Sequence, residues 1–289
     1  MTAGPEQLEL MGLPRPLFAA TPSKLANFDC PRRYRMTYLD RPSPPKGPPW
    51  AHNTVGAAVH LALARWWQLE PARRTPEAGA TLVIRNWQHD GFAGREQSEA
   101  WRDQAADWVT GYLADEAGRS DPRREPRGVE RTVATRTDRL AISGRVDRID
   151  ERDGELVIVD YKTGRSRLDA DDARGSQALA LYAVAAERTL HQRCRRVELH
   201  HLPTGEIAAF EHTDESLSQH LRRAGETATD IVAATDKVAG GAEPEQVFAP
   251  VPGPGCSWCD FRRHCPEGQA ASRPRASWDG LGLLDSSQP

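Results

Sequence analysis

The sequence has little lysine, no long hydrophobic run and no excess of positive charge. Its 289 residues include 38 basic and 41 acidic side chains, for a formal net charge of -3 at pH 7. Proteins that coat nucleic acid without regard to sequence usually carry a large positive excess, so the charge disfavours that class. No run of 18 apolar residues is present, and residues 1–16 lack the pattern of a secretory signal. We therefore expect a cytoplasmic protein with no membrane partner.

Lysine is the scarcest charged residue, with four copies against 34 arginines. A lysine inside a candidate motif therefore stands out from the background. A phosphate-binding G-x-x-x-x-G-K-[ST] motif is absent from the sequence, which excludes a helicase or ATPase of the P-loop type. Any unwinding of a duplex would have to come from a separate helicase.

Hydrophobic periodicity predicts helices in the first 120 residues and mainly strands after Gly128. Runs of β-branched residues follow Gly128, and Asp153-Gly154 predicts a tight hairpin between two of them. We expect an α/β or α+β fold with a mixed sheet flanked by helices and a helical N-terminal elaboration. The predicted helices are a short one near Ser23, then 55–69, two within 75–118 split near Gly91–Gly94, about 172–190, and about 214–235.

The chain divides into three parts by composition. Residues 1–20 are expected to be a flexible lead-in, and residues 269–289 a disordered tail. Residues 21–268 are expected to form one domain, in which a proline-rich connector spans 41–50.

The most informative stretch is GRVDRID (144–150), the turn, and LVIVDYKTG (156–164). Side chains alternate along a strand, so Asp160 and Lys162 share a face, and the apolar run before Asp160 indicates a buried strand. Asp147 and Asp160 are nearly equidistant from the turn and could meet across the ladder. Two adjacent carboxylates repel unless a divalent cation binds between them, and hard oxygen ligands suit Mg²⁺ or Mn²⁺. With a lysine beside them, these groups are suited to phosphodiester hydrolysis.

These residues resemble the PD-(D/E)XK nuclease superfamily, in particular its RecB-like exonuclease branch, which includes Cas4-like nucleases. GRVDRID and VDYKTG resemble two of its motifs, and GAAVH (56–60) resembles its upstream histidine motif. The resemblance implies metal ligation by His60, Asp147 and Asp160, with Lys162 as the catalytic lysine. SQALALYA (176–183) resembles the family's glutamine–tyrosine helix and implies catalytic roles for Gln177 and Tyr182, although these are five residues apart, about 140° around a helix.

Glu130 could approach this site as an extra carboxylate, but we interpret it as a solvated strand residue. Arginines cluster from Arg119 to Arg145 and could line a channel for phosphates despite the overall charge. The sequence contains no recognition-helix or zinc-finger pattern, so we expect DNA binding without sequence specificity. The resemblance implies action on single strands or DNA ends.

Three of the five cysteines form the cluster C-x2-C-x5-C near the C-terminus. In a reducing compartment such spacing indicates a metal site, and Cys30 is the natural fourth ligand, with Cys194 left over. The spacing alone suits either structural Zn²⁺ or a [4Fe–4S] cluster. The resemblance implies the iron–sulfur cluster, acting as a structural staple between the two ends of the domain. The ligand set is Cys30, Cys256, Cys259 and Cys265.

The leading hypothesis is a Mg²⁺- or Mn²⁺-dependent DNA exonuclease of the RecB family that functions in DNA repair or recombination. The alternative is a non-catalytic DNA-end-binding module or a Cas4-like module of CRISPR adaptation with a structural iron–sulfur cluster. Cleavage polarity, strand preference and oligomeric state cannot be read from the sequence.

Overall fold

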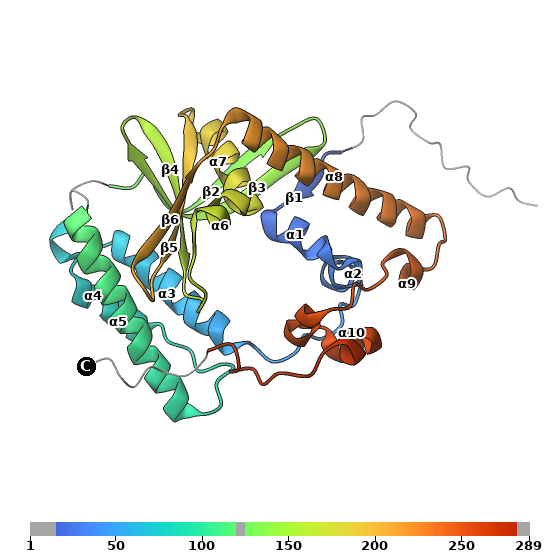
Figure 1. The fold of residues 1–289 in the computed structure, drawn as a ribbon, viewed down its shortest axis with the longest axis horizontal. Helices are drawn as coiled ribbons and strands as arrows, with labels where there is room; N and C mark the ends of the chain where they lie inside the picture. The colour runs from blue at the N-terminus through green and yellow to red at the C-terminus, as the bar shows by residue number, and fades with distance from the viewer. Residues whose placement is uncertain (1–15, 120–124, 282–289) are drawn as a thin grey trace, which may run out of the picture.

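The computed structural model describes residues 16–119 and 125–281, and its centre is a six-stranded mixed sheet (Figure 1). The strand order is β1-β3-β4-β5-β6, and β2 pairs with β3. Pairing is parallel for β1 with β3 and for β4 with β5, and antiparallel elsewhere. The long β3 pairs with β2 along one edge, and with β1 and β4 along the other. The strands are β1 (Phe18–Ala20), β2 (Gly128–Arg136), β3 (Leu140–Arg152), β4 (Glu155–Lys162), β5 (Cys194–His201) and β6 (Glu206–Glu211).

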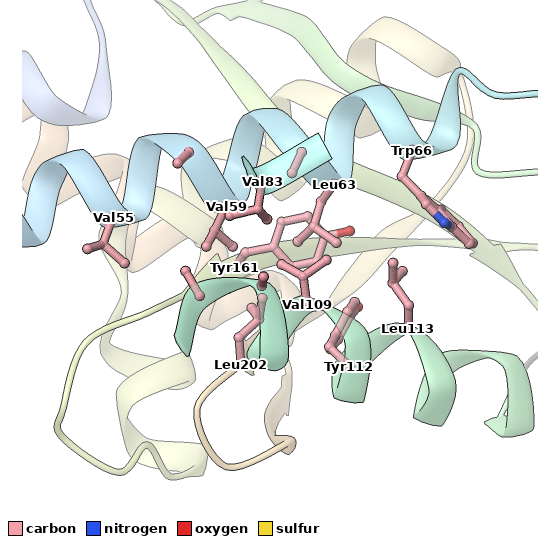
Figure 2. Close-up of a cluster of buried hydrophobic side chains, with 14 of the residues drawn as sticks. Val55, Val59, Leu63, Trp66, Val83, Val109, Tyr112, Leu113, Tyr161 and Leu202 are labelled. Carbon is pink, nitrogen blue, oxygen red and sulfur yellow. The ribbon is translucent and has the colours of Figure 1, made fainter. Parts of the chain in front are cut away.

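Helices cover both faces of this sheet and bury the apolar residues of β4. Val157, Val159 and Tyr161 of β4 pack into one core with α3, α4 and α5 (Figure 2). The alternate residues Leu156 and Ile158 pack into a second core with α7. The continuous apolar run of β4 therefore serves two layers. These helices are α3 (Ala51–Trp67), α4 (Pro76–Arg85), α5 (Arg95–Arg119), α6 (Ala170–Gly175) and α7 (Gln177–Leu190).

A third core joins the N-terminal segment to the start of β3. Ala20, Tyr34, Ile142, Ile231 and Phe248 are buried together there. The long α8 contributes Ile231, and its apolar stripe packs against β1 and α1. The elements are α1 (Pro22–Ala26), α2 (Pro31–Tyr38), α8 (Asp214–Ala239) and α9 (Pro244–Val247).

The expected helix over 172–190 is two helices, because Ser176 breaks it. Ser176 has extended backbone, and its hydroxyl accepts a hydrogen bond from the Leu179 N–H at 3.3 Å. Asp169 caps the preceding α6 in the same way, through the N–H groups of Asp171 and Asp172. The pattern of apolar residues does not reveal the helix break at Ser176.

The expected disordered tail over 269–289 is wrong for residues 269–281. The α10 helix (Pro266–Ala271) ends within this range, and the Ala51 N–H donates to the Ser277 carbonyl at 3.0 Å. Leu281 is buried in the core beneath α3. Residues 282–289 lie outside the described residues, as do residues 1–15 of the expected lead-in, of which residues 18–20 form β1. No helix of the described chain is long and apolar enough to span a membrane.

Candidate metal centre and active site

The β3–β4 hairpin brings Asp147 next to Asp160. Asp153 and Gly154 form its turn with φ of 52° and 81°, and Arg148 pairs with Val159. This register, continued by one residue past the end of the ladder, sets Asp147 opposite Asp160, and the charge of Asp147 acts on the Asp160 carboxylate. One Asp147 oxygen, Oδ2, also accepts a hydrogen bond from the Tyr161 N–H at 3.0 Å. The turn chemistry therefore sets the relative position of the two carboxylates, as the sequence predicted.

His60 of α3 contacts Asp147 directly. Its Nδ1 lies 3.2 Å from Asp147 Oδ2, and both side chains are largely buried. Burial acts to lower the pKa of His60, but the hydrogen bond and charge of Asp147 outweigh it and raise the pKa above its ordinary value. The inward face of α3, including Val59 and Leu63, packs into the core (Figure 2). This packing fixes the position of the helix that carries His60.

Glu130 also reaches this group, so its interpretation as a solvated strand residue is wrong. The pairs Val129–Arg148 and Arg131–Val146 place Glu130 opposite Asp147 on β2. Burial is the main cause that raises the pKa of Glu130, and Arg145 forms an ion pair with its carboxylate. Ligand atoms of His60, Glu130 and Asp147 all lie within 4.8 Å of one another. The position of Glu130 depends on the register of β2 on β3, which the sequence alone does not reveal.

Asp160 and Lys162 form a close ion pair beside these three residues. The Lys162 Nζ lies 2.5 Å from Asp160 Oδ2. Burial raises the pKa of Asp160, and the charge of Asp147 adds to this, whereas Lys162 opposes it. The carboxylate oxygens and the imidazole nitrogen of this site fit a divalent cation. His60, Glu130, Asp147 and Asp160 could hold it.

Tyr182 of α7 lies near the carboxylates of Asp147 and Asp160. Gln177 forms no hydrogen bond with either carboxylate. A Cβ on Gly144 would lie 2.3 Å from Tyr182 Cε1, so the ring packs directly on β3. Burial, with the charges of Asp160 and Asp147, raises the pKa of Tyr182. Gln177 is half-buried at the start of α7 and forms no side-chain hydrogen bond to another described residue.

A buried charge network supports the hairpin behind the site. Arg148 is fully buried, and its NH2 donates to Glu116 at 3.1 Å and to Asp150 at 2.9 Å. Its NH1 contacts the hydroxyl groups of Tyr112 at 3.3 Å and Tyr161 at 3.5 Å. Since Tyr161 lies between Asp160 and Lys162, the network fixes the strand that carries them. Sequence reasoning missed Arg148, because nothing in the motif distinguishes a buried arginine from an exposed one.

A cavity of about 1030 Å³ opens over these residues. His60, Glu130, Asp147 and Lys162 line it, together with residues from α3, α5 and the segment that ends at Leu281. Its other cationic side chains, Arg65, Arg145 and Arg165, can contact phosphates. Of the tryptophans on its wall, Trp101 belongs to the buried core and Trp108 packs against it.

The four cysteines predicted to act together line one small cavity. Cys30 comes from the start of α2, and the other three come from the turns around α10. Backbone N–H groups of Gly253 and Gly268 donate to the sulfurs of Cys256 and Cys265, each at 3.4 Å. Among the described residues, no three cysteine sulfurs lie within 4.8 Å of one another. Cys194 lies apart in β5, and burial raises its pKa to about 12.

Carboxylates, a histidine and a lysine lie together on the β3–β4 hairpin and α3 under a cationic cavity, and this set of groups suits the hydrolysis of phosphodiesters. A family model for the PD-(D/E)XK nuclease superfamily matches residues 19–266. The chain therefore belongs to the PD-(D/E)XK nuclease superfamily, and this membership makes it a nuclease with DNA as its expected substrate class.

Among solved structures, the chain is similar to a protein of Eubacterium rectale described as a "putative exonuclease". The TM-score is 0.54 at 14% identity, covering 84% of this chain and 86% of that one. A second structure, SSO0001, has a TM-score of 0.31 at 18% identity, covering 60% of this chain and 77% of that one. Comparison of the sequence with curated proteins gives no match.

Proposed function

We propose that the protein is a Mg²⁺- or Mn²⁺-dependent DNA exonuclease of the RecB family, acting on single strands or DNA ends in DNA repair or recombination. The observation that carries this proposal is the convergence of His60, Glu130 and Asp147 beside the Asp160–Lys162 pair. The cationic cavity above them supports a polyanionic substrate.

The residues divide the chemistry between them. A divalent cation held by His60, Glu130, Asp147 and Asp160 would stabilise negative charge on a phosphoryl oxygen and favour ionisation of water. Lys162, paired with Asp160, is placed to orient the attacking water and to balance charge at the phosphate. Arg145 and Arg165 would hold neighbouring phosphates from the cavity wall.

Digestion of end-labelled single- and double-stranded DNA with Mg²⁺ or Mn²⁺ tests this proposal. We expect degradation that EDTA abolishes, and a loss of at least about 100-fold in the Lys162→Ala and Asp160→Ala variants. Lys237→Ala, on the far end of α8, is the matched control and should retain activity. Full activity in Lys162→Ala with an intact fold would overturn the assignment, and DNA binding without cleavage would favour the end-binding alternative.

We also propose that Cys30, Cys256, Cys259 and Cys265 hold a [4Fe–4S] cluster as a structural staple. The support for this proposal is that all four cysteines line one small cavity. Such a cluster would join α2 to the turns around α10.

Metal and sulfide analysis of anaerobically purified protein tests this assignment. We expect about four iron and four sulfide per chain, and a Cys30→Ser variant with less iron and a lower Tm. Cys194→Ser is the control, because Cys194 lies outside the group, and its iron content should be unchanged. Stoichiometric zinc without sulfide would instead show a zinc staple. A separate helicase as partner stays part of the proposal and would be detected by co-purification.

A further inference from the structure

A second cavity of about 490 Å³ adjoins the catalytic cavity along α3. Asn53, Ala57 and Leu61 line both cavities. These residues are four apart, so they form one stripe along the helix. The opposite face of α3 is buried in the core (Figure 2), which fixes the position of the stripe. A chain bound in the catalytic cavity can therefore continue into the second one.

The two cavities differ in charge. The catalytic cavity has Arg65, Arg145, Lys162 and Arg165 on its walls against two carboxylates, Glu130 and Asp147, so its lining is net cationic. In the second cavity, all of whose lining residues are described, Lys46 is the single lysine or arginine, and it pairs with Asp260 at 3.4 Å. Asp90 adds negative charge there. A phosphate is therefore favoured in the first cavity and disfavoured in the second.

The second cavity offers apolar surface and free amides instead. Pro48, Pro49, Trp50 and Leu61 contribute to its wall, and Leu61 is 40% exposed despite being apolar. The Trp50 N–H donates to Asp260 at 3.1 Å, which holds the indole in place.

Two amide side chains on this wall have no internal partner. Asn53 and Gln88 are exposed and form no side-chain hydrogen bond to another described residue. Amides recognise base edges, and apolar or aromatic groups pack on base faces. The lining of the second cavity therefore matches a base better than a phosphate.

We propose, building on the nuclease function above, that the second cavity binds an unpaired nucleobase of the DNA strand whose phosphates occupy the catalytic cavity. A base that enters this cavity cannot remain paired, so the strand must be single or frayed within a few nucleotides of the scissile bond. The α3 stripe then separates a phosphate site from a base site.

An abasic-site scan measures this directly. Binding of labelled single-stranded DNA is followed by fluorescence anisotropy in EDTA, with one abasic site placed at successive positions from the end. We expect one or two adjacent positions to weaken binding about tenfold, and the others to have little effect. The Leu61→Ala and Asn53→Ala variants should each weaken this position dependence. Ile207→Ala should preserve it, because Ile207 is similarly exposed, at 38%, but lies on β6, outside both cavities.

The outcomes separate the two proposals. Equal effects at every abasic position, or unchanged position dependence in both Leu61→Ala and Asn53→Ala, would overturn the base site. Position-dependent binding without metal-dependent cleavage would overturn the nuclease proposal and leave the base site standing as a binding site. Cleavage with no position dependence would overturn the base site alone, and absence of DNA binding would overturn both.

Discussion

Glu130 shows how one residue can depart from regular strand geometry at a candidate site. Its φ is +48°, a left-handed value that costs a non-glycine residue about 1–3 kcal/mol. The flanking ladder pairs are maintained on both sides of it. The unusual backbone therefore accompanies a carboxylate that is delivered to His60 and Asp147, and strained residues of this kind cluster at functional sites.

His212 provides a residue-scale prediction for the pH dependence of stability. Burial, together with the charges of His220 and Arg195, lowers the pKa of His212 to about 4. The unfolded chain therefore binds the proton first, so this contribution is complete above pH 6.5 and is lost as the pH falls towards 4. We expect a loss of roughly 2 kcal/mol from this residue between those values.

Urea unfolding at pH 7 and pH 4.5 measures the effect. His212→Asn keeps a polar group near Ser216, which contacts Nδ1 at 2.9 Å, and should reduce the difference between the two pH values. His191→Asn is the control, because His191 is exposed at the left-handed end of α7, where asparagine is tolerated. Equal pH dependence in the wild type and His212→Asn would contradict this assignment.

At the scale of elements, Arg148 connects β3 with α5 and β4. Arg148→Met removes a buried positive charge from Glu116 and Asp150, so we expect it to cost about 3–5 kcal/mol in the free energy of unfolding. Arg193→Met is the control: Arg193 pairs with Glu155 at the surface, and such pairs contribute about 1 kcal/mol or less. Denaturant unfolding of both variants decides the point, and similar losses would contradict a special role for the network.

The elements around the catalytic hairpin could be predicted from local signals. The Asp153-Gly154 turn, the apolar run of β4 and the break between α4 and α5 are all encoded within a few residues. Glu130 and Arg148 could not be predicted, because their roles depend on the register of β2 on β3 and on packing between distant elements. The sequence did not predict that residues 272–281 are ordered, for the same reason: their hydrogen-bond partners lie at the start of α3 and at Gly91, far away in the sequence.

At the scale of the whole molecule, residues 272–281, which follow the stretch matched by the family model, stabilise α3. The Ser277 hydroxyl donates to the Gly91 carbonyl at 2.6 Å, and Leu281 is 3% exposed. We expect Leu281→Ala to cost about 2 kcal/mol in unfolding free energy, through lost burial and a cavity. Leu17→Ala, at an exposed leucine, should change stability by less than about 0.5 kcal/mol. Denaturant unfolding distinguishes the two, and equal losses would show that this segment does not support the core.

The position of residues 256–281 against α2 and α3 has a consequence for synthesis on the ribosome. Gly47 and Ala51 near the start of α3 form backbone hydrogen bonds with Asp260 and Ser277, which are translated more than 200 residues later. The helix that carries His60 thus lacks part of its support until those late residues leave the exit tunnel, and contacts of such sequence separation form slowly. A nascent chain would accordingly acquire a competent centre only after Asp260 and Ser277 have emerged from the ribosome.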